Sequence, residues 1–272
     1  MPLAEVNNIK LSYEIKGEGF PLILINGFAN KKETWVAQVG PLSEYFKVIT
    51  YDLRSSGGSS RPEEPYTMET LVEDLKGLMD YLNINKANIV CQSMGGWIAQ
   101  DFALKYPERL NKLVMIGSNH TGDGILNLLE SYKDLYELRK EDPTAAFWKF
   151  IRFTQTIKFR KELESDLKKK IHGVISVEEL IEESKINPLT PKDLENQAVA
   201  GSKHDSLDKL DQIKHETLIM AASKDKLAGV YVAEQMHEKM PNSTLKIFEE
   251  LGHEFYFSNA PEVNEEIINF LK

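Results

Sequence analysis

One serine, Ser93, lies among small residues in the stretch VCQSMGG, residues 90–96. An apolar run precedes it and a segment of helical period follows, so we expect a sharp strand-to-helix turn. A serine hydroxyl attacks a carbonyl only when a base takes its proton and donors stabilise the oxyanion. Such a turn exposes the hydroxyl and directs the next backbone N–H, that of Met94, at the developing charge. The stretch predicts a nucleophile, although glycine-rich turns of this kind also bind phosphates.

A base and an acid are needed beside this serine. Of the six histidines, we expect His253 to be the base, because it lies in ELGHE between the last predicted strand and the last predicted helix. His120, which also follows a strand end, is the alternative. Asp225 follows another predicted strand and would orient the imidazole and stabilise its protonated form. Asp123 is the rival acid, and Asp225 could instead cap a helix or remain a solvated charge.

These residues at strand ends, in the order serine, acid, histidine, resemble the α/β-hydrolase superfamily, whose elbow is Gly-x-Ser-x-Gly. Cys91 replaces the first glycine and is small enough to be tolerated, with its thiol packed rather than reactive. The resemblance implies a second oxyanion donor, the backbone N–H of Phe28 in NGF, residues 26–28, paired with that of Met94. Asn26 stands where the superfamily usually has histidine, as in some members that act on lactones.

A second loop also matches the superfamily. Residues 52–59, DLRSSGGS, resemble the Asp-x-Arg-Gly-x-Gly-x-Ser loop of related hydrolases, with Ser55 as the departure. We expect Asp52 and Arg54 to brace neighbouring loops rather than to react.

The elements that must position these residues alternate between β-branched apolar runs and longer helical periods, which indicates βα units around a mainly parallel sheet. An antiparallel hairpin, Val6–Asn8 with Lys10–Lys16, would edge it and bring the sheet to about eight strands. The other predicted strands are Pro21–Asn26, Lys47–Leu53, Asn88–Gln92, Lys112–Gly117, Thr217–Ala222 and Thr244–Glu249. Helices are expected after the N-cap Thr67, from the elbow to Pro107, and from Pro261.

About a hundred residues between the strands ending at Gly117 and beginning at Thr217 have almost no strand character, far beyond an ordinary connection. They predict an inserted helical cap, residues 119–213, on an α/β-hydrolase core of residues 1–118 and 214–272. The predicted cap helices are Leu126–Lys140, Pro143–Phe159, Lys161–Ile171 and Val177–Lys185. Its aromatic cluster, Phe147, Trp148, Phe150 and Phe153, either packs the cap on the core or lines an apolar pocket. Trp35 and Trp97 are open to the same two interpretations.

Composition limits the partners. The chain has 33 basic and 42 acidic residues, and the net charge of −9 disfavours nucleic acid and anionic membranes. No apolar run is long enough to span a bilayer and no signal peptide is seen, so we expect a cytoplasmic protein, a monomer or a homodimer. The single cysteine fits a reducing compartment. No metal or nucleotide motif is present, so no cofactor is expected.

The resemblance implies a serine hydrolase that cleaves small carboxylic esters, with lactones and thioesters as open alternatives. The reaction would pass through an acyl-enzyme on Ser93, with Asp225 and His253 completing the catalytic triad. Haloalkane dehalogenases and epoxide hydrolases of this fold carry aspartate at the elbow, so the serine argues against both. A small-molecule receptor that retains the triad, a cofactor-free perhydrolase or haloperoxidase, and a C–C bond hydrolase remain alternatives.

Overall fold

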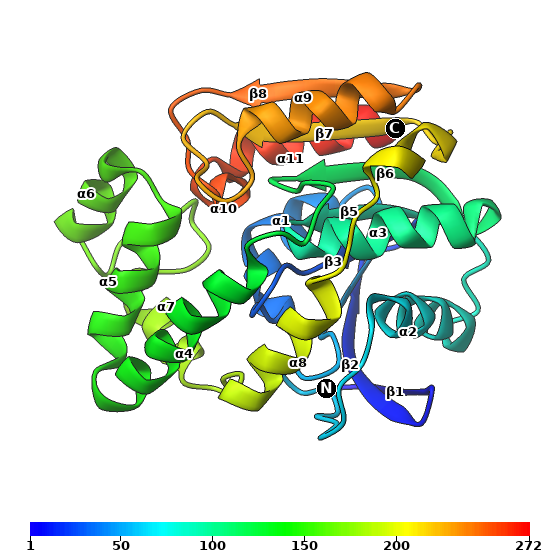
Figure 1. The fold of residues 1–272 in the computed structure, drawn as a ribbon. Helices are drawn as coiled ribbons and strands as arrows, with labels where there is room; N and C mark the ends of the chain where they lie inside the picture. Colours follow the sequence, from blue (N-terminus) through cyan, green and yellow to red (C-terminus); the bar gives the residue numbers. More distant parts are fainter.

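The computed structural model describes residues 1–272. They build one eight-stranded sheet in the order β1-β2-β4-β3-β5-β6-β7-β8 (Figure 1). The strands are β1 (Leu3–Val6), β2 (Ile9–Lys16), β3 (Pro21–Ile25), β4 (Lys47–Tyr51), β5 (Ala87–Gln92), β6 (Leu110–Ile116), β7 (Thr217–Ala222) and β8 (Ser243–Phe248). β1 pairs antiparallel with β2 and β2 antiparallel with β4, whereas all later pairs are parallel. The predicted α/β-hydrolase fold with a mostly parallel sheet is confirmed.

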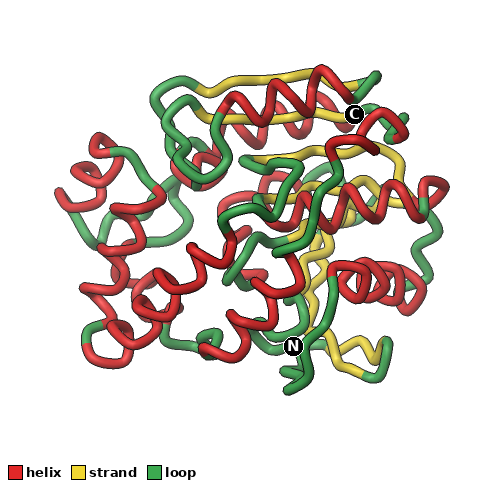
Figure 2. The backbone as a smooth tube through the Cα atoms, viewed as in Figure 1, coloured by secondary structure: helices red, strands yellow, loops and turns green.

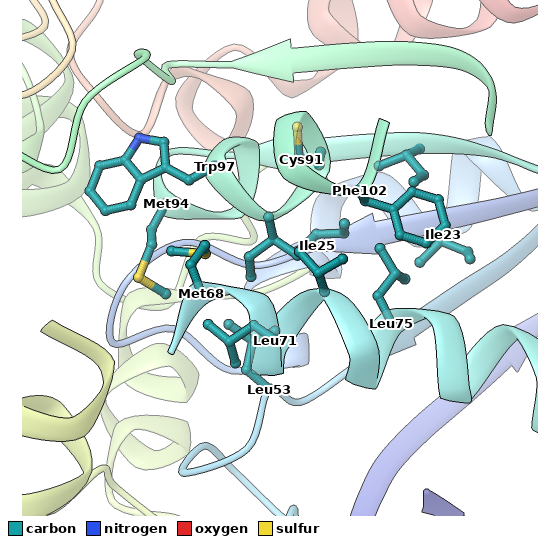
Figure 3. Close-up of a cluster of buried hydrophobic side chains, with 14 of the residues drawn as sticks. Ile23, Ile25, Leu53, Met68, Leu71, Leu75, Cys91, Met94, Trp97 and Phe102 are labelled. Atoms are coloured by element: carbon teal, nitrogen blue, oxygen red, sulfur yellow. The ribbon is translucent and has the colours of Figure 1, made fainter. Parts of the chain in front are cut away.

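Helices cover both faces of the sheet because successive strand residues point to opposite faces. In β3, Ile23 and Ile25 belong to one buried cluster, part of which is drawn in Figure 3. The helices that contribute to this cluster are α2 (Met68–Tyr81), α3 (Met94–Lys105) and α9 (Val230–Lys239). Leu22 and Leu24 belong to the other, with α1 (Val36–Leu42), α10 (Phe255–Ser258) and α11 (Ala260–Leu271). The short 3₁₀ helices are η1 (Lys32–Trp35), η2 (Pro107–Arg109) and η3 (Leu207–Gln212). The helix–sheet–helix layering is visible in Figure 2.

The N-terminal hairpin begins earlier than the sequence predicts. Residues 6–8 were expected to be a strand, but Val6 pairs directly with Ile9 and the two asparagines between them form the turn. Asn7 and Asn8 have φ of 48° and 62°. A two-residue hairpin turn needs positive φ at both positions, which asparagine tolerates better than most residues. The strand predicted at residues 6–8 is therefore wrong except for Val6, which is the last residue of β1.

Between β6 and β7 the chain forms five α-helices and the 3₁₀ helix η3, and no strand of the sheet. The inserted helices are α4 (Ile125–Glu141), α5 (Pro143–Thr154), α6 (Ile157–Ser165), α7 (Val177–Ser184) and α8 (Pro191–Gly201), which lie at the left and bottom of Figure 1. None of the helices in the molecule is long and apolar enough to cross a membrane. The division into a core of residues 1–118 and 214–272 and a cap of residues 119–213 stays a prediction.

Two boundaries within the insertion differ from the prediction. The helix expected over 143–159 stops at Thr154, and α6 starts anew because the Thr156 side chain accepts a hydrogen bond from the Phe159 amide. The helix expected over 161–171 is therefore displaced toward the N-terminus. No helix was predicted at α8, because proline often ends a helix. Pro191 lies in the first turn of α8, after the N-cap Thr190, which forms a reciprocal capping box with Asp193.

Candidate active site

Ser93 occupies the sharp turn between β5 and α3. Its φ of 50° and ψ of −123° lie outside the usual regions, a strain on the order of 1–3 kcal/mol that persists only when neighbours fix it. The Ser93 amide donates to the Ile116 carbonyl at 3.0 Å, and the Ser118 hydroxyl donates to the Ser93 carbonyl at 2.8 Å. The Ser93 side chain is partly exposed and lines a cavity of about 270 Å³, hereafter the Ser93 cavity.

The residues two positions either side of Ser93 explain why the turn needs small side chains. A Cβ at Gly95 would lie 2.5 Å from the Ile25 carbonyl oxygen and 2.7 Å from that of Asn26, so only glycine lets α3 approach β3 this closely. On the other side, the Cys91 thiol is fully buried, 3.3 Å from the Val114 carbonyl oxygen (Figure 3). Burial raises the pKa of Cys91 far above its usual value. The thiol is therefore neutral and packed.

Asp225 and His253 meet at the carboxyl edge of the sheet. The Nδ1 atom of His253 lies 2.8 Å from Oδ2 of Asp225, and both side chains are almost fully buried. The other carboxylate oxygen of Asp225 accepts the backbone N–H groups of Leu227 at 2.7 Å and Ala228 at 3.0 Å. These bonds fix the carboxylate, so it can hold the Nδ1 proton of the imidazole.

Gly117, directly after β6, lies against this pair in a backbone conformation that favours glycine. It has φ of +51°, and a Cβ there would lie 3.4 Å from Asp225 Oδ2 and 3.5 Å from His253 Nδ1. A side chain at this position would be strained and would touch both groups. From the sequence, Gly117 was expected only to end a strand.

The charge of His253 is set by two opposing effects. Burial lowers the pKa of His253, but the adjacent Asp225 carboxylate and, more weakly, Glu254 outweigh burial and raise the pKa above its usual value. A carboxylate beside an imidazolium stabilises the charged form. His253 can therefore hold a proton more readily than a free imidazole while its Nδ1 stays directed at Asp225.

The other ring nitrogen of His253 contacts Gln92 rather than Ser93. His253 Nε2 lies 3.0 Å from the Gln92 side-chain nitrogen, and no hydrogen bond joins the Ser93 hydroxyl to the ring. An amide N–H donating to Nε2 requires the ring proton on Nδ1, which matches the Asp225 contact. In substrate-free enzymes the serine–histidine bond is often long and tightens later. Gln92 could not be singled out from the sequence, because its side chain reaches His253 only in the folded chain.

The two expected oxyanion donors border the Ser93 cavity. Phe28 and Met94 both line it. Met94 is the first residue of α3, where backbone N–H groups have no intrahelical acceptor, and the Phe28 N–H has no acceptor within the protein. The Asn26 side chain holds this loop by donating to the Tyr51 carbonyl at 3.1 Å. The next amide, that of Ala29, donates to the Gln197 side chain of α8 at 3.0 Å.

The rival residues lie apart from the Asp225–His253 pair. His120 contacts Gln235 at 3.3 Å and lies 3.9 Å from Asp205. Asp123 lines the Ser93 cavity but contacts no histidine. The structure thus brings together Asp225 and His253 and leaves His120 and Asp123 outside the pair.

The aromatic residues whose role the sequence left open fall into two groups: some pack in the core and others line a cavity. Trp35 is fully buried beside Tyr256, with ring centroids 5.2 Å apart. Trp97 lines the Ser93 cavity and donates to the Asn119 side chain at 2.7 Å. Phe147 and Phe150 pack on the buried cluster and also line a second cavity.

The loop after β4 braces its surroundings. Asp52 accepts the backbone N–H groups of Lys32 at 2.8 Å and Gly58 at 3.0 Å. Arg54 forms a buried bidentate pair with Asp74 of α2, with N–O distances of 2.6 and 2.7 Å. Neither residue contacts Ser93 or His253, in keeping with a structural role.

A second buried carboxyl group, Glu254, lies directly after the histidine. The Tyr256 hydroxyl donates to it at 2.5 Å. Burial raises the pKa of Glu254, against the lowering effects of His253 and Tyr256. Nothing in the sequence distinguished Glu254 from the other acidic residues. No cluster of three His, Cys, Asp or Glu side chains is placed to share a metal ion.

Comparison with known proteins agrees with this architecture. A family model described as the alpha/beta hydrolase fold matches residues 21–260. A poly(3-hydroxyalkanoate) depolymerase of Ectopseudomonas oleovorans is 28% identical over 255 residues, which are 93% of this chain and 84% of that protein. A thermophilic esterase from Thermogutta terrifontis superposes with a TM-score of 0.81 at 25% identity, covering 99% and 97% of the two chains. The enol-lactonase from Burkholderia xenovorans LB400 gives a TM-score of 0.83 at 22% identity over 99% of each chain.

Proposed function

The chain belongs to the alpha/beta hydrolase family, and on that premise we propose that it is a serine hydrolase of small carboxylic esters, with lactones and thioesters as related substrates. The observation that carries the proposal is the buried Asp225–His253 pair at the sheet edge where the strained turn presents Ser93. The esterase and lactonase among the similar structures support the same class of chemistry.

In the proposed reaction the Ser93 hydroxyl attacks the substrate carbonyl carbon and gives its proton to His253 Nε2. Asp225 stabilises the imidazolium, and the N–H groups of Phe28 and Met94 bind the oxyanion. The tetrahedral intermediate collapses when His253 passes the proton to the leaving alcohol, which leaves an acyl group on Ser93. Water, with His253 as base, then attacks this acyl-enzyme and releases the acid.

Gln92 must change its contact for the first step to occur. In the resting structure its amide occupies His253 Nε2, the lone pair that the Ser93 proton needs. Substrate in the Ser93 cavity would bring the hydroxyl to Nε2 in place of that amide. The exchange involves side-chain rotation only and therefore costs little compared with a change of backbone.

The test is hydrolysis of p-nitrophenyl acetate and butyrate by the wild type, Ser93→Ala and Ser202→Ala. Ser202 lies just beyond α8 and its hydroxyl bonds only the Val199 carbonyl, so its variant controls for a serine-to-alanine change. We expect Ser93→Ala to lose at least about a thousandfold in kcat and Ser202→Ala to match the wild type. Equal rates in all three proteins would refute the proposal. Many turnovers per molecule would also exclude the receptor alternative.

A further inference from the structure

A second cavity of about 330 Å³, hereafter the distal cavity, adjoins the Ser93 cavity. Phe28 lines the Ser93 cavity and Tyr132 of α4 lines the distal one. Their rings are in edge-to-face contact, with centroids 5.1 Å apart. Ala29 and Asn30, which follow Phe28 directly, line the distal cavity as well. The two cavities are therefore neighbours across one aromatic pair.

One face of α4 runs along both cavities. Leu128 lines the Ser93 cavity, whereas Tyr132, Tyr136 and Arg139 line the distal one. The spacings of four, four and three residues place these side chains on a single helix face. The helix rises about 1.5 Å per residue, so Arg139 lies about 16 Å beyond Leu128 along the axis. A ligand that follows this face from Ser93 would have an extended arm.

The charges around the distal cavity are paired except for one. Lys31 contacts Glu183 at 2.9 Å, and Glu33 contacts Lys32 at 2.5 Å. Arg139 is partly buried and has neither a carboxylate nor a hydrogen-bond acceptor within the protein. Burial lowers the pKa of its guanidinium, and the nearby Tyr132 hydroxyl offsets this only in part. A desolvated guanidinium without an anion is costly, and its planar donors suit a carboxylate.

We propose that the distal cavity binds a carboxylate at the far end of the substrate's acyl arm, held by Arg139, so that the enzyme prefers monoesters of dicarboxylic acids and the corresponding lactones. The inference rests on the proposed function, since it names the substrate class of that same site. The aromatic walls formed by Tyr132, Phe147 and Phe150 suit the apolar part of the arm. Glu33 and Glu183 also line the cavity, which favours a singly charged carboxylate over a phosphate dianion.

The test compares esters of equal chain length that differ only in the end group. The mono-p-nitrophenyl esters of suberic and dodecanedioic acids are paired with p-nitrophenyl octanoate and dodecanoate. We expect Arg139→Met to lower the ratio of kcat/KM for the charged ester to that for the neutral ester by about 10- to 100-fold, the usual effect of a charge-assisted hydrogen bond. The dodecanedioate ester, with the longer arm, should show the larger change. Arg139→Lys should be intermediate.

Lys133→Met is the matched control. Lys133 also lies on α4, pairs with Glu130 at 3.1 Å and does not line the distal cavity, so its loss removes the same charge from the helix without touching the cavity. The ratio should then stay within about twofold of the wild type. Circular dichroism of each variant shows whether it folds, and Arg139→Gln replaces Arg139→Met if the latter does not.

Binding provides a readout that does not need turnover. In the Ser93→Ala background, calorimetry with suberate should show affinity that falls at least tenfold in Arg139→Met. An unchanged ester ratio together with unchanged suberate binding would overturn the carboxylate site, while Ser93-dependent hydrolysis of neutral esters would leave the proposed function intact. If no ester is hydrolysed at all, the proposed function fails, and Arg139-dependent suberate binding would still support the carboxylate site.

Discussion

Replacing Gly95 with alanine tests the packing that shapes the turn around Ser93. The new Cβ would lie 2.5 Å from the Ile25 carbonyl oxygen and 2.7 Å from that of Asn26, whereas ordinary contacts begin at 3.4 Å. The obstacles are backbone atoms at the end of the central strand β3, which cannot move aside as a side chain can. Either α3 or the loop that carries Phe28 must therefore shift by several tenths of an ångström.

The expected cost follows from this clash. Overpacking of a well-packed site costs about 1–3 kcal/mol, and the higher helix propensity of alanine returns up to about 1 kcal/mol. We expect Gly95→Ala to lower the free energy of unfolding by about 1–2 kcal/mol and Tm by about 2–8 °C. Because the displaced atoms adjoin the proposed oxyanion donors, kcat/KM for p-nitrophenyl butyrate should fall by more than about tenfold.

Gly40→Ala is the matched comparison. Gly40 also lies inside a helix, α1, but no atom lies within 4 Å of its added Cβ. The gain in helix propensity should then appear without a clash, so Tm stays the same or rises by up to about 4 °C and kcat/KM is unchanged. Calorimetry and initial rates on both variants decide the matter. If Gly95→Ala unfolds and reacts as the wild type does, the claim that this close approach requires glycine is wrong.

Three further predictions concern charge and packing near the site. Since only neutral His253 accepts the serine proton and its pKa is raised, the acidic limb of kcat/KM against pH should lie above pH about 6.5. Glu254→Gln removes a contribution that raises this pKa, so the limb should move to lower pH, and an unmoved limb would contradict the coupling. Cys91→Gly should cost about 1–3 kcal/mol of stability with kcat/KM largely intact; a collapse in rate in a folded variant would mean that the thiol matters. Asp74→Asn leaves Arg54 buried with a poorer partner and should cost about 3–5 kcal/mol in urea unfolding, and a loss below about 1 kcal/mol would refute a structural role for the pair.

Much of the sheet could be predicted because its strands are buried on both faces and carry continuous apolar residues. The prediction for Thr217–Ala222 matches β7 to the residue, and Thr67 caps α2 as expected. The errors fall where local signals compete. The pattern in residues 143–171 does not show where one helix ends, because the break depends on capping by Thr156. Pro191 both breaks and begins helices, and only the reciprocal Thr190–Asp193 bonds decide between the two.

The candidate site was predictable only as far as topology dictates it. Residues at the carboxyl ends of parallel strands share one edge of the sheet, so the meeting of Asp225 with His253 followed from strand order. Contacts made by long side chains did not follow. Arg139 and Glu254 belong to no sequence pattern. Arg139 is notable because its guanidinium is partly buried without an acceptor in the folded chain. Glu254 is notable because its carboxyl group is buried beside His253 and Tyr256.

Gly27 shows how the proposed oxyanion loop and the resting state of the base depend on one another. A Cβ at Gly27 would lie 2.2 Å from the Gln92 side-chain oxygen and 3.1 Å from Ser93 Cβ. The missing side chain therefore gives the Gln92 amide its place, and from there its nitrogen reaches His253 Nε2. Asp225 holds the opposite side of the ring, so the imidazole is fixed from both sides with its proton on Nδ1. Glycine in this loop thus serves the tautomer of the base as well as the path of the backbone, and a side chain there would displace the Gln92 amide that contacts His253.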